Sequence, residues 1–180
     1  MTVFTEAWLA EHQRKIVEYR GAPVESVIAR PDKLTFTLPK PTITLNKLLH
    51  MHPMVRSKYA KTLSSEVAAA IGWNWLGGHR PWDRVTVTIT RRSIQLADTD
   101  GATGGTKPLI DTLVKRSERH PWALGVFIDD SPDRMTLIVQ QVRVTRRAEV
   151  GTDVVVEELA GTVPLKKKRG HRQSGLAEAV

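Results

Sequence analysis

Two pairs of aspartates are the residues in this chain whose spacing suits joint chemistry. Asp98 and Asp100 stand two residues apart at the predicted end of a strand, and Asp129 and Asp130 follow the apolar residues 126–128. Alternate strand residues emerge on one face about 7 Å apart, so the first pair can converge on one ion. Carboxylates about 4 Å apart repel by roughly 4 kcal/mol at an effective dielectric near 20, and a divalent cation relieves that repulsion. All-oxygen ligands favour Mg²⁺, with Mn²⁺ as a substitute.

A magnesium ion held in this way activates water and stabilises the charge on a phosphate during its transfer. Lys107 lies between the two acidic pairs at the start of a predicted helix, where its ammonium group can meet a phosphate. Both features also have a simpler interpretation. Aspartates collect in turns and at strand ends, and Lys107 stands four residues before Asp111, which is the spacing of a solvated ion pair on a helix.

The elements that must position these residues alternate between strand and helix patterns. Apolar and polar residues alternate in the predicted strands, whereas apolar residues recur every three or four positions in the helices. The predicted strands are 33–38, 85 towards 96, 135–145 and 153–159, the last two as a terminal hairpin, and the predicted core helices are 57–71 and 108–116. The glycine-rich residues 101–105 are predicted to connect a strand to a helix. This order indicates a compact α+β single domain with a mixed sheet of about four to five strands, two core helices and an N-terminal helix.

The two ends of the chain differ in composition from its middle. Residues 5–19 form a predicted amphipathic helix in an N-terminal extension, residues 1–32, and the domain itself spans 33–160. Residues 161–180 are a predicted disordered tail with half of the formal net charge of +8, since five basic side chains face Glu178 alone. The contiguous members of this cluster are Lys166, Lys167, Lys168 and Arg169. This surplus suits a polyanionic partner without requiring one.

The composition also excludes several classes of protein. With 180 residues and no cysteine, the chain can bury a core without disulfides and offers neither a thiolate zinc site nor a cysteine nucleophile. No apolar run approaches the roughly 18 residues of a membrane helix, and the N-terminus lacks a secretion signal, so we expect a cytoplasmic protein without a membrane partner. No glycine motif for phosphate binding is present, which argues against a nucleotide cofactor.

Taken in order, the chemical residues resemble the pattern of the RusA family of Holliday junction resolvases. That pattern is an acidic D-x-D, a lysine, an aspartate four residues later with a leucine near by, and a glycine leading to DD. The residues that match it are Asp98, Asp100, Lys107, Asp111, Leu113, Gly125, Asp129 and Asp130. The segment LPKPTITLN at 38–46 is similar to the family's first strand and its proline-rich exit. The resemblance covers about residues 33–147.

The resemblance implies a Mg²⁺-dependent endodeoxyribonuclease that resolves four-way junctions or related branched DNA in recombination, repair or replication. It further implies a homodimer, of phage or prophage type, which places two active sites on one junction. Asp98, Asp100 and Asp130 would be the catalytic metal ligands, and Lys107 would be the catalytic lysine. Two alternatives stay open, a nuclease for flaps or forks and a protein that binds branched DNA without cutting it.

Basic residues supply the expected DNA contacts. Those in the domain are His50, Arg56, Lys58, Lys61, Arg91 and Arg92, and those in the tail are Lys166, Lys167, Lys168 and Arg169. The first four fall where the family's junction-facing loop and helix start lie, although Lys58 and Lys61 also fit a solvated helix face. Two departures from the family bear on these expectations. Gly101 replaces an asparagine and extra residues precede Lys107, while Ala97 replaces a basic residue, with Arg91 and Arg92 upstream.

Residues 72–83 form a segment rich in glycine and proline that contains three tryptophans. Trp73, Trp75 and Trp82 could stack on unpaired bases. Aromatic side chains beside glycine and proline more often form a small packed cluster, and we favour that interpretation.

Overall fold

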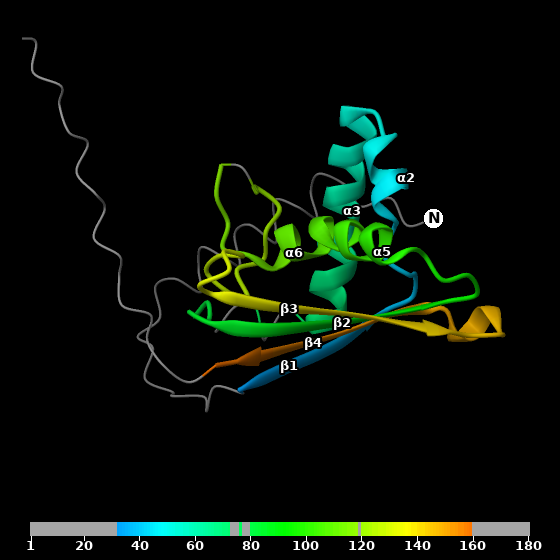
Figure 1. Ribbon diagram of the computed structural model, residues 1–180. Coiled ribbons are helices and arrows are strands. Elements are labelled where there is room, and N and C mark those ends of the chain that lie inside the picture. Colours follow the sequence, from blue (N-terminus) through cyan, green and yellow to red (C-terminus); the bar gives the residue numbers. More distant parts are fainter. Residues whose placement is uncertain (1–31, 73–75, 77–79, 119, 160–180) are drawn as a thin grey trace, which may run out of the picture.

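The computed structural model is a four-stranded mixed sheet with helices packed against one of its faces (Figure 1). It describes residues 32–72, 76, 80–118 and 120–159. The strands are β1 (Lys33–Leu38), β2 (Val85–Ser93), β3 (Met135–Arg143) and β4 (Gly151–Glu158), and they lie in the order β1-β4-β2-β3. Strands β2 and β3 run parallel, whereas β4 is antiparallel to both of its neighbours, β1 and β2. The α+β class and the mixed sheet predicted from the sequence are confirmed.

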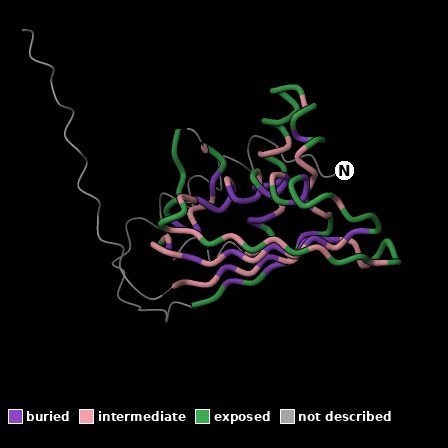
Figure 2. Tube along the Cα trace, viewed as in Figure 1, coloured by how far each residue is buried: buried purple, intermediate pink, exposed green. Residues whose placement is uncertain are grey.

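One face of the sheet carries the core because apolar residues alternate with polar ones along the strands. Leu34 and Phe36 of β1 lie opposite Val156 and Val154 of β4, and all four side chains are buried. The core extends to apolar side chains from the helices, which are Leu63, Val67, Leu109, Ile110 and Leu113. In β1 the alternate polar residues Lys33, Thr35 and Thr37 are exposed on the other side, and Figure 2 shows the exposed and half-buried colours along the sheet.

Five helical segments complete the described fold. They are α2 (Leu45–Leu49), α3 (Pro53–Ile71), α5 (Thr99–Gly105), α6 (Lys107–Leu113) and the 3₁₀ turn η2 (Arg147–Glu149). His52 caps α3 by accepting a hydrogen bond from the Met54 amide, and Pro53 occupies the first turn, where its missing N–H costs nothing. Gly72 ends α3 with a φ of 89°, a conformation that side chains with a Cβ rarely adopt.

The glycine-rich residues 101–105, which we predicted to connect a strand to a helix, instead belong to helix α5. It forms because Asp98 caps its N-terminus and because its glycines allow close packing against the segment that leads into α2. A Cβ on Gly105 would lie 1.7 Å from the Ile43 carbonyl oxygen, and one on Gly104 would lie 2.8 Å from the Leu45 Cδ2. Tertiary contact therefore outweighs the low helix propensity of glycine here.

Two further expectations require correction. The terminal hairpin is wrong, because β3 pairs with β2 and β4 lies between β1 and β2. The first core helix begins at Pro53, earlier than the predicted 57, because its first turns are exposed and have no apolar periodicity. The predicted N-terminal helix 5–19 and the tail 161–180 lie outside the described residues. Within the described part of the chain, no helix has both the length and the apolar character needed to cross a membrane.

Candidate active site

A backbone clamp on the end of α6 positions the second acidic pair. Residues 124–127 run beside the C-terminus of α6, where the amides of Leu124 and Val126 donate to the carbonyls of Thr112 (2.7 Å) and Leu113 (2.8 Å). These bonds satisfy carbonyls that a helix end would otherwise leave without partners. The residues that follow therefore begin next to α6, and Asp130 lies beside this helix, whose first residue is Lys107.

Lys107 lies between two carboxylates from different elements. Its Nζ is 2.8 Å from Asp111 Oδ1, one helical turn away, and it donates a hydrogen bond to Asp130 Oδ2 in the segment before β3. The side chain of Lys107 is 51% exposed, whereas those of Asp111 and Asp130 are 28% and 31% exposed. The ion pair that the simpler interpretation of Lys107 predicted from the i, i+4 spacing is thus present, and a second, long-range partner joins it.

The electrostatics of this pair keep both groups charged. Burial alone would lower the pKa of Lys107, but its hydrogen bonds and the charges of Asp111 and Asp130 outweigh burial and raise the pKa above its ordinary value. Burial would likewise raise the pKa of Asp130, but the hydrogen bond and charge of Lys107 outweigh it and hold that pKa below its ordinary value. Lys107 is therefore a cation and Asp130 an anion at neutral pH.

The carboxylates of Asp129 and Asp130 have different hydrogen-bond partners. Asp129 Oδ1 accepts a hydrogen bond from the Asp130 amide at 2.9 Å, so its carboxylate turns back onto the chain. The Asp130 carboxylate instead accepts a hydrogen bond from Lys107. His120 also lies close to Asp111, with Nδ1 4.0 Å from Asp111 Oδ1. His120 was not predicted from the sequence, since nothing in its local spacing connects it to α6.

Asp98 and Asp100 stand elsewhere than on a strand face. Strand β2 ends at Ser93, and Asp98 is the N-cap of α5, with Oδ2 accepting from the Gly101 amide at 3.2 Å. Asp100 lies exposed in the first turn of α5. The predicted strand geometry for this pair is therefore wrong. A Cβ at position 101 would come within 2.3 Å of Asp98 Oδ1, so glycine makes room for the capping carboxylate where the RusA-type pattern has asparagine.

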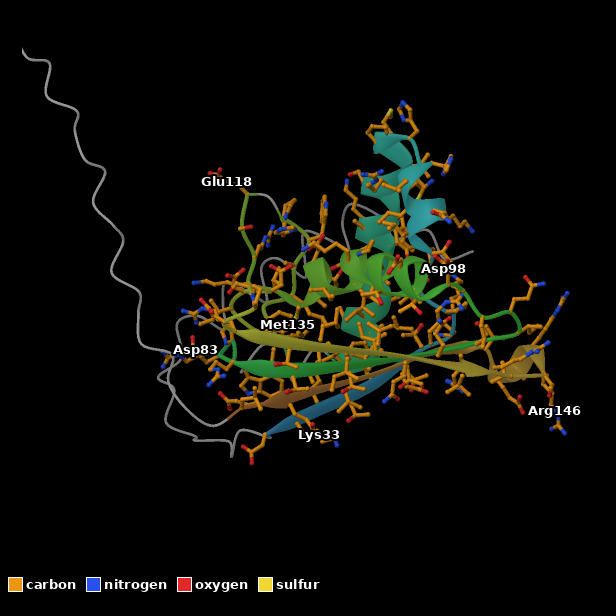
Figure 3. The ribbon with its side chains drawn as sticks, viewed as in Figure 1. Lys33, Asp83, Asp98, Glu118, Met135 and Arg146 are labelled. Carbon is orange, nitrogen blue, oxygen red and sulfur yellow. The ribbon has the colours of Figure 1, made fainter. Side chains whose placement is uncertain are left out.

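The three expected metal ligands match Mg²⁺ in donor type but not in arrangement. Carboxylate oxygens are the donors that Mg²⁺ prefers. Within residues 32–72, 76, 80–118 and 120–159, however, no group of three or more His, Cys, Asp or Glu side chains is placed to hold a metal ion. In Figure 3, Asp98 lies above one half of the sheet, and Met135, the first residue of β3 after Asp130, lies towards the other half.

A cleft of about 580 Å³ connects the lysine to the start of α3. Its walls come from α2, the N-terminal half of α3, α6 and the segment after α6. The charged and aromatic side chains that line it are Arg56, Lys107, Asp111, Glu118, His120 and Trp122. Arg56, one of the predicted DNA-contacting residues near the start of α3, and Lys107, the predicted catalytic lysine, therefore line one cleft.

Trp122 forms part of this cleft and was not predicted from the sequence. The Lys61 ammonium lies 4.3 Å from the centre of the Trp122 ring, a cation–π contact. The Ser64 hydroxyl donates to the Trp122 carbonyl at 2.6 Å, which ties the loop to α3. Trp82, by contrast, is fully buried, as the packing interpretation predicted. Trp73 and Trp75 lie outside the described residues.

The remaining basic residues divide into exposed and internal groups. His50 and Lys58 are exposed near the start of α3. Arg91 is 8% exposed and donates to the Thr42 carbonyl at 3.0 Å, and burial lowers the pKa of its guanidinium. Arg92 pairs with Asp153 at 2.9 Å. Arg91 thus binds the chain itself in the interior, whereas the side chain of Arg92 is 28% exposed beside Asp153; we had expected phosphate contacts from both. The tail residues from Lys166 to Arg169 are not among those described.

Comparison with models of protein families, with curated proteins and with solved structures finds no match to this chain.

Proposed function

We propose that this protein is a Mg²⁺-dependent endonuclease that cuts branched DNA, of the RusA type of Holliday junction resolvase, acting in bacterial or phage-infected cytoplasm. The observation that supports the proposal is the position of Lys107. Its ammonium lies between Asp111 and Asp130 at the wall of a cleft that also contains Arg56. The order of residues along the chain matches the family pattern as well.

Lys107 is suited to bind the phosphate that is cut. Its raised pKa keeps the ammonium charged at neutral pH, and it is half exposed, so a phosphate oxygen can approach it from solvent. A phosphate that binds Lys107 competes with Asp130 for the same three N–H donors. Its arrival therefore weakens the ion pair and frees the Asp130 carboxylate for another partner.

The ammonium also stabilises the reaction electrostatically. Negative charge on the nonbridging oxygens changes during phosphodiester hydrolysis, and a preorganised cation beside them costs no reorganisation at that moment. Arg56 contributes to binding from the part of the cleft formed by α3, where its guanidinium donates to the Leu48 carbonyl at 2.9 Å and retains further N–H donors. Asp98, Asp100 and Asp130 would hold Mg²⁺, which would supply an activated water there. This requires Asp98 to leave its capping position and Asp130 to leave its pairing with Lys107.

Cleavage of a synthetic four-way junction with and without Mg²⁺ tests this proposal directly. Asp98→Asn, Asp100→Asn and Asp130→Asn should each lower cleavage at least a hundredfold, about 2.7 kcal/mol of transition-state stabilisation, because an amide is a poor Mg²⁺ ligand. Asn also caps helices well, so Asp98→Asn should still fold. Gel-shift binding in EDTA should stay near the wild-type level, because binding depends on phosphate contacts.

Asp129→Asn is the matched control, since it changes the neighbouring carboxylate that turns onto the backbone. It should cut at close to the wild-type rate. If wild-type protein does not cut, or if Asp100→Asn cuts as fast as Asp129→Asn, the metal-site assignment fails. A panel of junction, flap and fork substrates separates the resolvase from the related flap or fork nuclease.

A second candidate function is binding of branched DNA without cleavage. The observations that favour it are the capping role of Asp98 and the pairing of Asp130 with Lys107, which both occupy carboxylates that catalysis would need. Such a protein would bind junctions as tightly in EDTA as in Mg²⁺ and would leave them intact over many hours. The same cleavage assay therefore distinguishes the two candidates.

A further inference from the structure

The helical tip, residues 45–58, projects at one end of the molecule, although α2 packs against α5. It consists of α2 and the first turns of α3, and Figure 1 shows it projecting beyond the layer of α5 and α6. Every residue from His52 to Lys58 is exposed, and Figure 2 shows the same end of the molecule in the exposed colour. The core holds α3 only through its later turns, where Leu63 and Val67 are buried.

The helical tip presents large apolar side chains to solvent. Met54 is 76% exposed, Leu49 62% and Val55 53%. Single exposed apolar residues are common on protein surfaces, but these three gather at one projecting end of two joined helices. Such a cluster is typical of a surface that contacts another molecule.

The helical tip is also held in one conformation. His52 caps α3 through the Met54 amide, at 3.3 Å. The guanidinium of Arg56 donates to the carbonyl of Leu48 at 2.9 Å, which joins the first turn of α3 to α2. Pro53 fixes the backbone at the start of the helix. The apolar side chains are thus presented on a rigid support.

The charge around the helical tip identifies the partner as a polyanion. Residues 33–65 contain no aspartate or glutamate, and the basic residues of the tip and the turn that follows it are Lys47, Arg56, Lys58 and Lys61. The cleft that reaches Lys107 opens at the same place, since Pro53, Arg56 and Ser57 line it. Basic side chains around an apolar end suit DNA, whose backbone is anionic and whose stacked bases are apolar.

We propose that the helical tip is a wedge that enters DNA at a branch point and separates stacked bases there. Met54 and Val55 would pack against the bases, as apolar side chains inserted between base steps do in other DNA-binding proteins. Lys47 and Lys58 would contact the flanking phosphates. An opened strand could then follow the cleft towards Lys107, so this inference rests on the proposed function and names the feature of DNA that the site recognises.

A four-way junction with 2-aminopurine at the branch point tests the wedge, because the fluorescence of this base rises when it unstacks. The full chain is titrated in EDTA, so that cutting does not contribute. Wild-type protein should raise the fluorescence of the junction and not that of a linear duplex with the same base. The double variant Met54→Ser/Val55→Ser should lose the rise while its gel-shift affinity changes by less than about tenfold, because phosphate contacts dominate affinity.

Two controls separate the wedge from general surface effects. Ile138→Ser/Val142→Ser removes apolar side chains of similar kind from β3, where they are 40% and 44% exposed, and it should retain the rise. Lys47→Ala/Lys58→Ala should keep the rise at saturation and reduce the slope of log K against log salt by up to about 1.8, at about 0.9 for each contact. Thermal unfolding of all variants confirms that they are folded.

The outcomes are distinct from those of the cleavage assay. A full rise with Met54→Ser/Val55→Ser, or no rise with wild type, overturns the wedge even if the protein cuts junctions. A rise that depends on the helical tip supports the wedge even if no variant cuts DNA. If light scattering shows that Met54→Ser/Val55→Ser alone converts a dimer to a monomer, the tip is an interface between copies and the wedge is overturned.

Discussion

Replacing Gly105 with alanine tests the packing that places Lys107. A Cβ at this position would lie 1.7 Å from the Ile43 carbonyl oxygen, 2.8 Å from the Ile43 carbonyl carbon and 3.0 Å from the Thr44 Cα. All three atoms belong to the backbone, so no rotation of a side chain can relieve the overlap. Helix α5 and the segment before α2 must separate by more than an ångström, and Lys107, two residues further on, moves with them.

The expected cost follows from two opposed effects. Alanine gains up to about 1 kcal/mol over glycine in a helix, whereas overpacking usually costs about 1–3 kcal/mol and occasionally more. Because the overlap is with backbone, we expect the upper part of that range and a net loss of about 2–3 kcal/mol in the free energy of unfolding. For a domain of this size, that loss lowers the melting temperature by about 4–12 °C.

Gly104→Ala is the matched control. Its Cβ would meet the Leu45 side chain, whose Cδ atoms, at 2.8 and 3.0 Å, can turn aside and whose Cβ, at 3.1 Å, needs only a small shift. Its free energy of unfolding should stay within about 1 kcal/mol of wild type. Urea unfolding of the three proteins measures the difference, and cleavage per folded molecule measures the displacement of Lys107. Equal stability of Gly105→Ala and Gly104→Ala would refute the packing argument.

Three further predictions concern charge and assembly. The pKa of Asp130 is depressed in the folded protein, so this carboxylate stabilises the fold above its unfolded pKa near 3.9, and the stabilisation is lost as pH falls through the folded pKa. The pKa of Lys107 is raised, so its ammonium stabilises the fold below its unfolded pKa of about 10.4, and that stabilisation is lost as pH rises through the folded pKa. In Lys107→Met, the free energy of unfolding measured with urea should therefore fall less at acid and at alkaline pH than in wild type. Parallel pH profiles of the two proteins would contradict an ion pair between Lys107 and Asp130. Deletion of residues 164–180 should reduce the salt dependence of DNA binding by about 0.9 in log–log slope for each phosphate that the tail neutralises, without changing preference for branched DNA; an unchanged slope would show that the tail does not touch DNA. Light scattering should report about twice the chain mass of 20.1 kDa, because paired incisions across a junction need two active sites, and a monomer even on junction DNA would exclude this.

Much of the fold was predictable because one buried face leaves a period of two in the strands. The predicted strand at 33–38 agrees with β1, and the predicted starts at 85 and 135 agree with β2 and β3. What could not be predicted depends on distant contacts. The alternation in β4 indicates a strand but does not identify its neighbours, and the helix at α5 depends on packing against Ile43, far away in the sequence.

The candidate site divides in the same way. The spacing of Lys107 and Asp111 on one helix predicts their ion pair, which is local. The contact with Asp130 depends on the backbone hydrogen bonds between residues 124–127 and the end of α6. No periodic pattern in the sequence indicates such bonds. His120 and Trp122 enter the cleft from an irregular segment, where position in space is independent of spacing in sequence. For Asp98 the local sequence allows two roles, because an aspartate before a helix can be its N-cap as well as a metal ligand.

The central place of β4 has a consequence for the order of folding. This strand is the last in the described chain, and it supplies the neighbour of β1, the first, across more than a hundred residues. During synthesis β1 must therefore wait, with its hydrogen-bonding groups unpaired, until β4 has left the ribosome. Contacts of such long range slow folding. A chain that stops before Gly151 would keep β2 and β3 paired but leave β1 separated from them, so a nonsense mutation late in the gene should divide the sheet rather than trim its edge.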